Sequence, residues 1–163
     1  MPALAIVGIT VVIPGPAFAA CSGYSCHGLD PTAQACGVTS TAGPVYAVTN
    51  GVTYATLWNR YSFGCNANWA RAQLSAASVS AGYRLYAYVY TSDSRGSFEY
   101  MCWPGIPNNA CALSESCAGF PNAGYGGSSV VYTDMVDGTN VTYANVIVLD
   151  TAGHTVAAVS VSQ

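Results

Sequence analysis

Apolar and polar side chains alternate along most of this 163-residue chain, and turn-forming residues interrupt the alternation at short intervals. Residues 83–91 are the clearest case, because the alternation there separates one face (Tyr83, Leu85, Ala87 and Val89) from the other (Arg84, Tyr86, Tyr88 and Tyr90). Successive side chains of a β-strand point to opposite faces, so a period of two is typical of strands. The pattern predicts an all-β fold, a single antiparallel β-sandwich or a small barrel.

Turn signals predict two hairpins. Asn50-Gly51 lies between predicted strands at 45–49 and 52–58, and Asn-Gly readily adopts the positive φ angles of a type I′ turn. Near the C-terminus, residues 139–150 are predicted to pair with residues 154–162 across a short Thr-Ala-Gly turn.

One stretch, residues 66–77, has a helix-forming composition. Asn66 or Asn68 can cap a helix there, so we expect one short helix or turn near 66–77. Strands are also predicted on either side of a long loop at 104–127, which is rich in Gly, Pro and Asn.

The first twenty residues predict a secretory signal peptide. An apolar run at 3–13 is followed by a Pro-Gly-Pro break and by Ala17-Phe18-Ala19, a pattern that signal peptidase cleaves. The run is shorter than the roughly 20 residues that a membrane span needs. No Lys or Arg precedes it, so the true start codon can lie upstream, and a buried N-terminal element is the alternative. We expect a signal peptide at 1–20, one domain at 21–163, and a secreted, extracellular or cell-surface location.

Seven cysteines in a chain of this kind predict disulfide bonds. They are Cys21, Cys26, Cys36, Cys65, Cys102, Cys111 and Cys117. Disulfides are typical of proteins that reach an oxidising compartment. No C-x2-C pair occurs and the spacings fit no zinc template, so we expect bridges and no metal.

The odd cysteine count has two explanations. Phe18-Ala19-Ala20-Cys21 resembles a lipobox, whose cysteine carries a lipid, and removing Cys21 leaves six cysteines for three bridges with 15 pairings. Alternatively, Cys21 forms a disulfide, and one of Cys102, Cys111 and Cys117 is unpaired or pairs with another chain. We expect membrane contact only if Cys21 is lipidated.

Charge is scarce, because charged residues make up 7% of the chain, with four arginines, no lysine and a net charge of -3. The arginines are scattered, so no basic patch exists for nucleic acid or for an anionic membrane surface. Ser, Thr, Asn and Tyr supply the polarity instead, as on the surface of an extracellular protein or of one that packs against its own copies.

The segment from Cys21 to Arg71 carries a recognisable motif. Its elements are Cys21-x4-Cys26, Asp30-Pro31, Cys36, Arg60-Tyr61-Ser62, Cys65 and Trp69-Ala70-Arg71. This pattern resembles a secreted bacterial family known as domain of unknown function 2690, and residues 133–138 resemble a late segment of its members. Asn59 and the cysteines after residue 100 depart from the family pattern. The resemblance implies secretion and disulfide pairing among the first four cysteines, and it implies no activity because the family has none assigned.

The motif residues have a structural interpretation. Asp30-Pro31 favours a turn in which the carboxylate accepts backbone N–H groups. Trp69 is large enough to cover a bridge formed by Cys36 or Cys65, and Arg60 or Arg71 is predicted to pair with Asp30 in fork geometry.

Tyrosine is the strongest candidate for function among the side chains. Tyr86, Tyr88 and Tyr90 share one face of a predicted strand, where they can stack on sugars or contact protein, although core packing is the alternative. We therefore expect a non-catalytic cell-surface binding or structural protein, with a cell-wall polysaccharide or a protein as partner. Self-assembly into multimers or fibres is a second hypothesis, because the chain lacks the lysines that often protect edge strands.

Catalytic and cofactor hypotheses rest on fewer residues. The chain has two histidines, His27 and His154, and no G-x-S-x-G motif, so a secreted hydrolase would depend on carboxylates such as Asp93, Glu99, Asp134 and Asp137. Cys21-x4-Cys26-His27 resembles a stretched haem-attachment motif. We expect neither an enzyme nor a cofactor.

Overall fold

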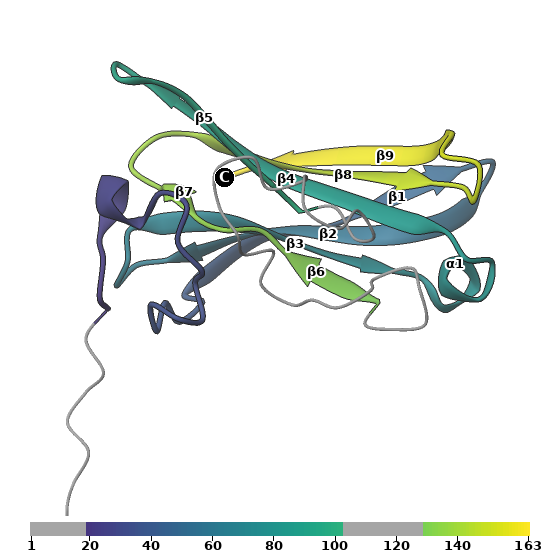
Figure 1. Ribbon diagram of the computed structural model, residues 1–163, viewed down its shortest axis with the longest axis horizontal. Helices are drawn as coiled ribbons and strands as arrows, with labels where there is room; N and C mark the ends of the chain where they lie inside the picture. The colour runs from purple at the N-terminus through teal and green to yellow at the C-terminus, as the bar shows by residue number, and fades with distance from the viewer. Residues whose placement is uncertain (1–18, 103–128) are drawn as a thin grey trace, which may run out of the picture.

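The computed structural model describes residues 19–102 and 129–163, which form two antiparallel β-sheets packed face to face (Figure 1). The first sheet has the order β1 (Ser40–Thr49), β2 (Val52–Ser62), β3 (Ala67–Leu74) and β6 (Val130–Tyr132), and β7 (Val136–Asp137) also pairs with β3. The second sheet has the order β5 (Gly96–Cys102), β4 (Arg84–Asp93), β8 (Thr142–Leu149) and β9 (Thr155–Ser162). The predicted all-β sandwich is confirmed, and the sheets do not close into a barrel.

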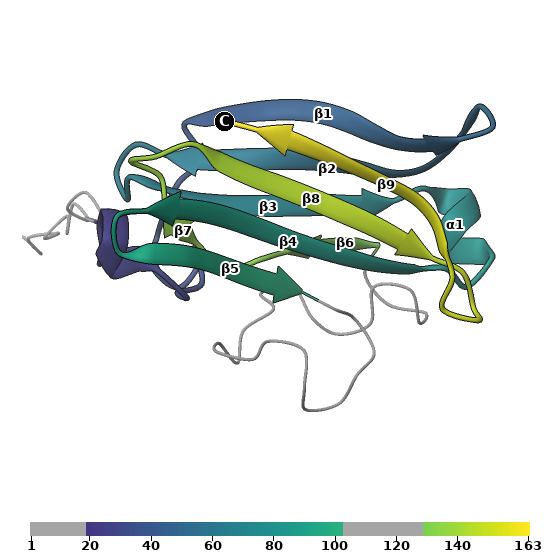
Figure 2. The ribbon, with the colours of Figure 1, turned by 90° about the horizontal axis from the view of Figure 1, so that it is seen from above.

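Two short helical elements mark opposite ends of the sandwich. The 3-10 helix η1 (Gly23–Cys26) lies beside β7, and α1 (Ala76–Ser80) lies at the other end, where the chain passes from β3 to β4 (Figures 1 and 2). Seen from above, β9 runs alongside β1, so these edge strands of the two sheets meet along one side (Figure 2).

Both predicted hairpins form. β1 pairs with β2 across Asn50 and Gly51, whose φ angles of 51° and 78° are the positive values that a type I′ turn requires. β8 pairs with β9, and at their turn the Asp150 carboxylate accepts the backbone N–H groups of Ala152 and His154.

The helix predicted near residues 66–77 forms only at the end of that stretch, as α1. Residues 67–74 form β3 instead, because their alternation places small or apolar side chains toward the core and Trp69, Arg71 and Gln73 on the other face. The cap also differs from the expectation: Ser75 accepts the backbone N–H of Ser78, whereas Asn66 sits in the turn with a φ of 48°.

Small aliphatic side chains fill the space between the sheets. The buried core consists of Ala47, Ala55, Leu57, Ala70, Ala72, Leu74, Leu85, Ala87, Val89, Val131, Val136, Ala144, Val146, Val148 and Ala157. No aromatic ring belongs to this buried set among the described residues, so the large rings of the strands lie elsewhere. Leu85, Ala87 and Val89 face the core from β4, as the alternation of residues 83–91 predicts.

A buried amide network joins the two sheets at the end near η1. The Asn59 amide donates to the carbonyl oxygen and hydroxyl of Thr142, at 3.2 and 3.0 Å. Asn68 in turn donates to the Asn59 carbonyl oxygen at 3.0 Å. Because buried polar groups are costly when they lack partners, this network favours one register of β2, β3 and β8.

Three expectations concern residues outside this description. The predicted signal peptide, apart from Ala19 and Ala20, and the predicted loop at 104–127 are both outside the described residues. The prediction that Cys102, Cys111 or Cys117 is unpaired concerns side chains that the structure does not describe. Within the described residues, no helix is long and apolar enough to cross a bilayer.

Leu57→Ala tests the core. We expect it to lower the free energy of unfolding by about 2–5 kcal/mol, because Leu57 is fully buried between the sheets and its loss leaves a cavity. Val48→Ala is the matched control: Val48 is 48% exposed, so its truncation should change stability by less than about 0.5 kcal/mol. Denaturant unfolding measures both variants, and equal losses would contradict the assignment of the core.

Candidate functional site

Two disulfide bonds hold the N-terminal segment, one within it and one that attaches it to an end of the first sheet. Cys21 bonds Cys26 around η1, and Cys36 bonds Cys65 in the turn between β2 and β3, with Cα separations of 5.2 and 5.7 Å. All four cysteines are buried, and they form a cluster with Trp69 and other apolar side chains. A disulfide sulfur cannot at the same time form a thioether, so the Cys21–Cys26 bridge is an alternative to a lipid on Cys21 and to haem attachment through this pair.

The Asp30-Pro31 turn forms as predicted. The Asp30 carboxylate accepts the backbone N–H groups of Thr32 at 2.7 Å and Ala33 at 3.3 Å. The backbone N–H of Cys36 donates to the Pro31 carbonyl oxygen at 2.8 Å and closes the loop. The turn therefore brings Cys36 back toward the sheet, where it meets Cys65.

The predicted ion pair between Asp30 and an arginine does not form. Among the described residues, neither Arg60 nor Arg71 makes an ion pair, and the Asp30 carboxylate accepts backbone groups instead. Arg71 lies over the ring of Trp58, with its Cζ atom 4.4 Å from the ring centroid. The pair does not form because both arginines lie on the outer face of strands, whereas the Asp30 carboxylate accepts hydrogen bonds from backbone N–H groups of its own loop.

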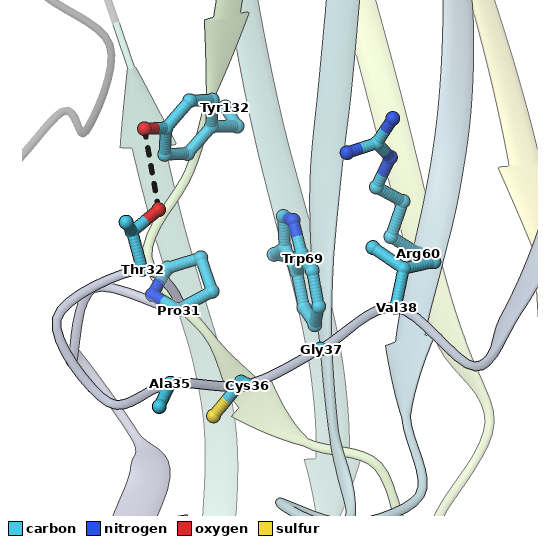
Figure 3. Close-up of a pocket in the computed structure, with 9 residues that line it drawn as sticks. All are labelled: Pro31, Thr32, Ala35, Cys36, Gly37, Val38, Arg60, Trp69 and Tyr132. Carbon is cyan, nitrogen blue, oxygen red and sulfur yellow. Dashed lines mark hydrogen bonds between the residues drawn. The ribbon is translucent and has the colours of Figure 1, made fainter. Parts of the chain in front are cut away.

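A groove of about 470 Å³ lies between the loop and the outer face of the first sheet (Figure 3). Its lining residues are Pro31, Thr32, Ala35, Cys36, Gly37, Val38, Arg60, Trp69 and Tyr132. In Figure 3 the side chains of Tyr132, Trp69 and Arg60 stand side by side across β6, β3 and β2. Trp69 is 3% exposed and forms the floor, whereas Tyr132 and Arg60 are half-buried and remain accessible.

Strand register explains why these side chains gather. Arg60 lies opposite Trp69, and Trp58 opposite Arg71, so the pairs of β2 and β3 alternate cation and ring on one face. Tyr132 of β6 lies opposite Arg71 and extends the row. The outer face therefore presents two guanidinium groups among three aromatic rings.

These two guanidinium groups have no carboxylate partner among the described residues. Arg71 donates to the Gln73 amide oxygen at 3.3 Å, and Arg60 has a buried Nε atom without a hydrogen-bond partner. Burial lowers the pKa of both groups, and for Arg60 the neighbouring charge of Arg71 lowers the pKa further. An arginine stays charged in proteins, so Arg60 in the groove and Arg71 beside it are positive charges without a carboxylate partner among the described residues.

The predicted tyrosine row lies on the outer face of the second sheet. Tyr86, Tyr88 and Tyr90 are half-buried there, and the rings of Tyr86 and Tyr88 are 5.8 Å apart. Tyr143 of β8 lies opposite Tyr90, with ring centroids 6.3 Å apart, and lengthens the row. The structure thus places these rings away from the core and on the opposite side of the sandwich from the groove.

Two of the four carboxylates considered for hydrolysis, Asp93 and Asp137, form ion pairs with one cation. Arg95, in the turn between β4 and β5, contacts the carboxylates of Asp93 and Asp137 and lies over the ring of Tyr24, 3.9 Å from its centroid. Burial alone would raise the pKa of Asp137, but hydrogen bonds from Thr139 and Arg95 outweigh it and lower that pKa. A carboxyl group with a lowered pKa is a poor general acid, so the arrangement works as a clamp between β5, β7 and η1.

The histidines lie apart from each other. His27 follows η1, and burial lowers its pKa. His154 is exposed at the turn between β8 and β9, beside Asp150.

The sequence does not predict the groove, although it singles out four of the lining residues as structural: Pro31, Cys36, Arg60 and Trp69. Tyr132, and Trp58 beside the groove, carry no signal that distinguishes them. The alternation of Trp69, Arg71 and Gln73 was the available signal, and the helix-forming composition of 66–77 obscured it.

Comparison with protein-family models, with curated proteins and with solved structures found no match for this chain.

Lowering the pH should weaken the Arg95 clamp. The Asp137 pKa lies below its usual 3.8 in the folded chain, so the folded state binds fewer protons than the unfolded state as the pH falls toward and through 3.8. The free energy of unfolding should therefore decrease over that range, and Asp137→Asn should make the decrease shallower. Urea unfolding at several pH values between about 6 and 3 measures this. Parallel pH curves for the two proteins would contradict the role of Asp137.

Proposed function

We propose that this protein is an extracellular, non-catalytic binding domain whose groove, at Arg60, Trp69 and Tyr132, recognises acidic carbohydrate. The observation that carries the proposal is the pair of arginines without carboxylate partners on an aromatic-rich outer face.

The chemistry of the groove favours an anionic ligand with an apolar face. A guanidinium group binds a carboxylate or phosphate through two parallel hydrogen bonds, and it is the side chain best suited to that geometry. The half-buried ring of Tyr132 offers a surface on which the C–H face of a sugar ring can pack. A sugar acid combines both properties in one residue.

The groove has the size and the support that such a site needs. Its volume of about 470 Å³ falls within the range of small-ligand sites, and its open shape suits one or two residues of a longer chain. Trp69 and the buried Cys36–Cys65 bridge hold the floor and one wall, so little order must be created on binding.

An extracellular location is part of the proposal. Two buried disulfides persist best in an oxidising compartment, and the signal-like N-terminus is consistent with export. Membership of the secreted family that the sequence resembles stays a prediction, and it would agree with this location without supplying an activity.

The tyrosine row is a second candidate surface on the opposite sheet. Its supporting observation is Tyr143, which is 46% exposed and lengthens the row beyond the three predicted rings. Such a surface suits a neutral sugar chain, a protein or another copy of this chain. It bears little charge, so binding there should depend weakly on salt.

A matched pair of ligands tests the groove. We expect oligogalacturonate to bind more tightly than its methyl ester, which has the same rings without the charge. Arg60→Gln and Arg71→Gln should each weaken binding of the acid by about tenfold, because a hydrogen bond to a charged group contributes about 1.5–3 kcal/mol. Isothermal titration calorimetry of the unmodified protein and both variants with each ligand measures these differences, and added salt should weaken binding of the acid alone.

Arg84→Gln is the control variant for this experiment. Arg84 lies on the outer face of the second sheet and donates to the Thr151 carbonyl oxygen, so its replacement removes a charge without touching the groove. Equal binding of acid and ester, or an equal loss in Arg84→Gln, would contradict the proposal. If both ligands bind and Tyr86→Ala abolishes their binding, the binding site is the tyrosine row rather than the groove.

A further inference from the structure

The four cysteine sulfurs of the N-terminal segment converge on one point. The Sγ atoms of Cys21, Cys26, Cys36 and Cys65 all lie within 4.8 Å of one another. Their spacing in the sequence predicts no metal site, since no C-x2-C pair is present. The fold nevertheless gathers the four sulfurs, bonded as two disulfides, around one centre.

The arrangement is close to that of a tetrathiolate metal site. A tetrahedral zinc ion with Zn–S bonds of about 2.3 Å spaces its four sulfurs about 3.8 Å apart. The four sulfurs already lie within 4.8 Å, so a change on the order of 1–2 Å in each pair converts two bridges into four ligands.

The backbone around the sulfurs permits such a change. Cys21 precedes η1 and Cys26 ends it, Cys36 lies in the loop after the Asp30-Pro31 turn, and Cys65 lies in the turn between β2 and β3. None of the four lies within a β-strand, so the sulfurs can move apart without breaking strand pairing.

The surroundings exclude water. All four side chains are less than 9% exposed, and Trp69 and Met135 pack against them. A metal ion held there would therefore take its ligands from the chain rather than from solvent.

We propose that the chain binds one zinc ion through these four sulfurs before its cysteines are oxidised. Four thiols lose four protons and coordinate Zn²⁺, and no electrons are transferred in this step. Oxidation to the two disulfides transfers two electrons per bridge to an external disulfide, which is reduced to two thiols each time, and it releases the zinc ion. The metal and the bridges are therefore alternative ways to hold the same loop against the sheet. In both states the loop forms the wall of the groove.

The experiment uses the full chain with Cys102→Ser, Cys111→Ser and Cys117→Ser, so that no other thiol can bind metal. After reduction with a phosphine and its removal without oxygen, native mass spectrometry should find one zinc per chain. Zinc should also protect all four thiols from alkylation by about 100-fold. The oxidised protein is the matched control and should bind no zinc.

The Co²⁺ spectrum identifies the metal ligands in the chain that retains all four cysteines, so the result does not depend on whether a cysteine variant folds. Co²⁺ added to the reduced chain should give the visible spectrum and charge-transfer bands of a tetrahedral four-thiolate site. Cys65→Ser in the same background should lose at least one thiolate band and bind zinc about 100-fold more weakly. Absence of zinc in the mass spectrum, an octahedral cobalt spectrum, or equal binding by the oxidised protein would each overturn the proposal.

Discussion

The Cys36–Cys65 bridge is the constraint on which the rest of the candidate site depends. It links residues 29 apart in the sequence and fixes the loop after Asp30 to the turn between β2 and β3. Closing a loop of this length restricts the unfolded chain and contributes about 2–4 kcal/mol to stability. Without the bridge the groove would have a floor, formed by Trp69 on the sheet, but no fixed wall. The loop's own turn chemistry at Asp30 shapes the wall but does not attach it.

The composition of the core determines where the aromatic rings lie. Alanine, valine and leucine fill the inner faces of both sheets, and the buried amides of Asn59 and Asn68 occupy one end. Among the described residues no aromatic ring is fully buried in this core, and Tyr54 and Tyr83 pack only against its border. Trp58 and Tyr132 are therefore on one outer face and the tyrosines of β4 on the other. Both surfaces proposed for binding follow from this distribution, because a half-buried ring on an outer face can still contact a ligand.

The sequence was informative where a pattern was local. The Asn50-Gly51 turn and the alternation at 83–91 could be predicted because each is set by neighbours in the chain. Residues 66–77 were harder, because their Ala, Arg and Gln residues favour a helix while pairing with β2 imposes a strand. The groove and the four-sulfur cluster could not be predicted. Both bring together residues from a loop, a turn and separate strands, and only the register of β2 on β3 places Arg60 beside Trp69.

The environments of the four arginines support the proposal that the groove binds an anion. Arg95 contacts two carboxylates, and Arg84 donates to a backbone carbonyl oxygen. Arg60 and Arg71 have no carboxylate partner among the described residues, although the chain has seven acidic residues for four cations. A shortage of anions therefore does not explain the unpaired charges. Two like charges on adjacent strands repel each other and are partly desolvated, which costs free energy in the unbound protein. A bound anion would offset this repulsion. Relief of the repulsion on binding would therefore add to the affinity for an anion.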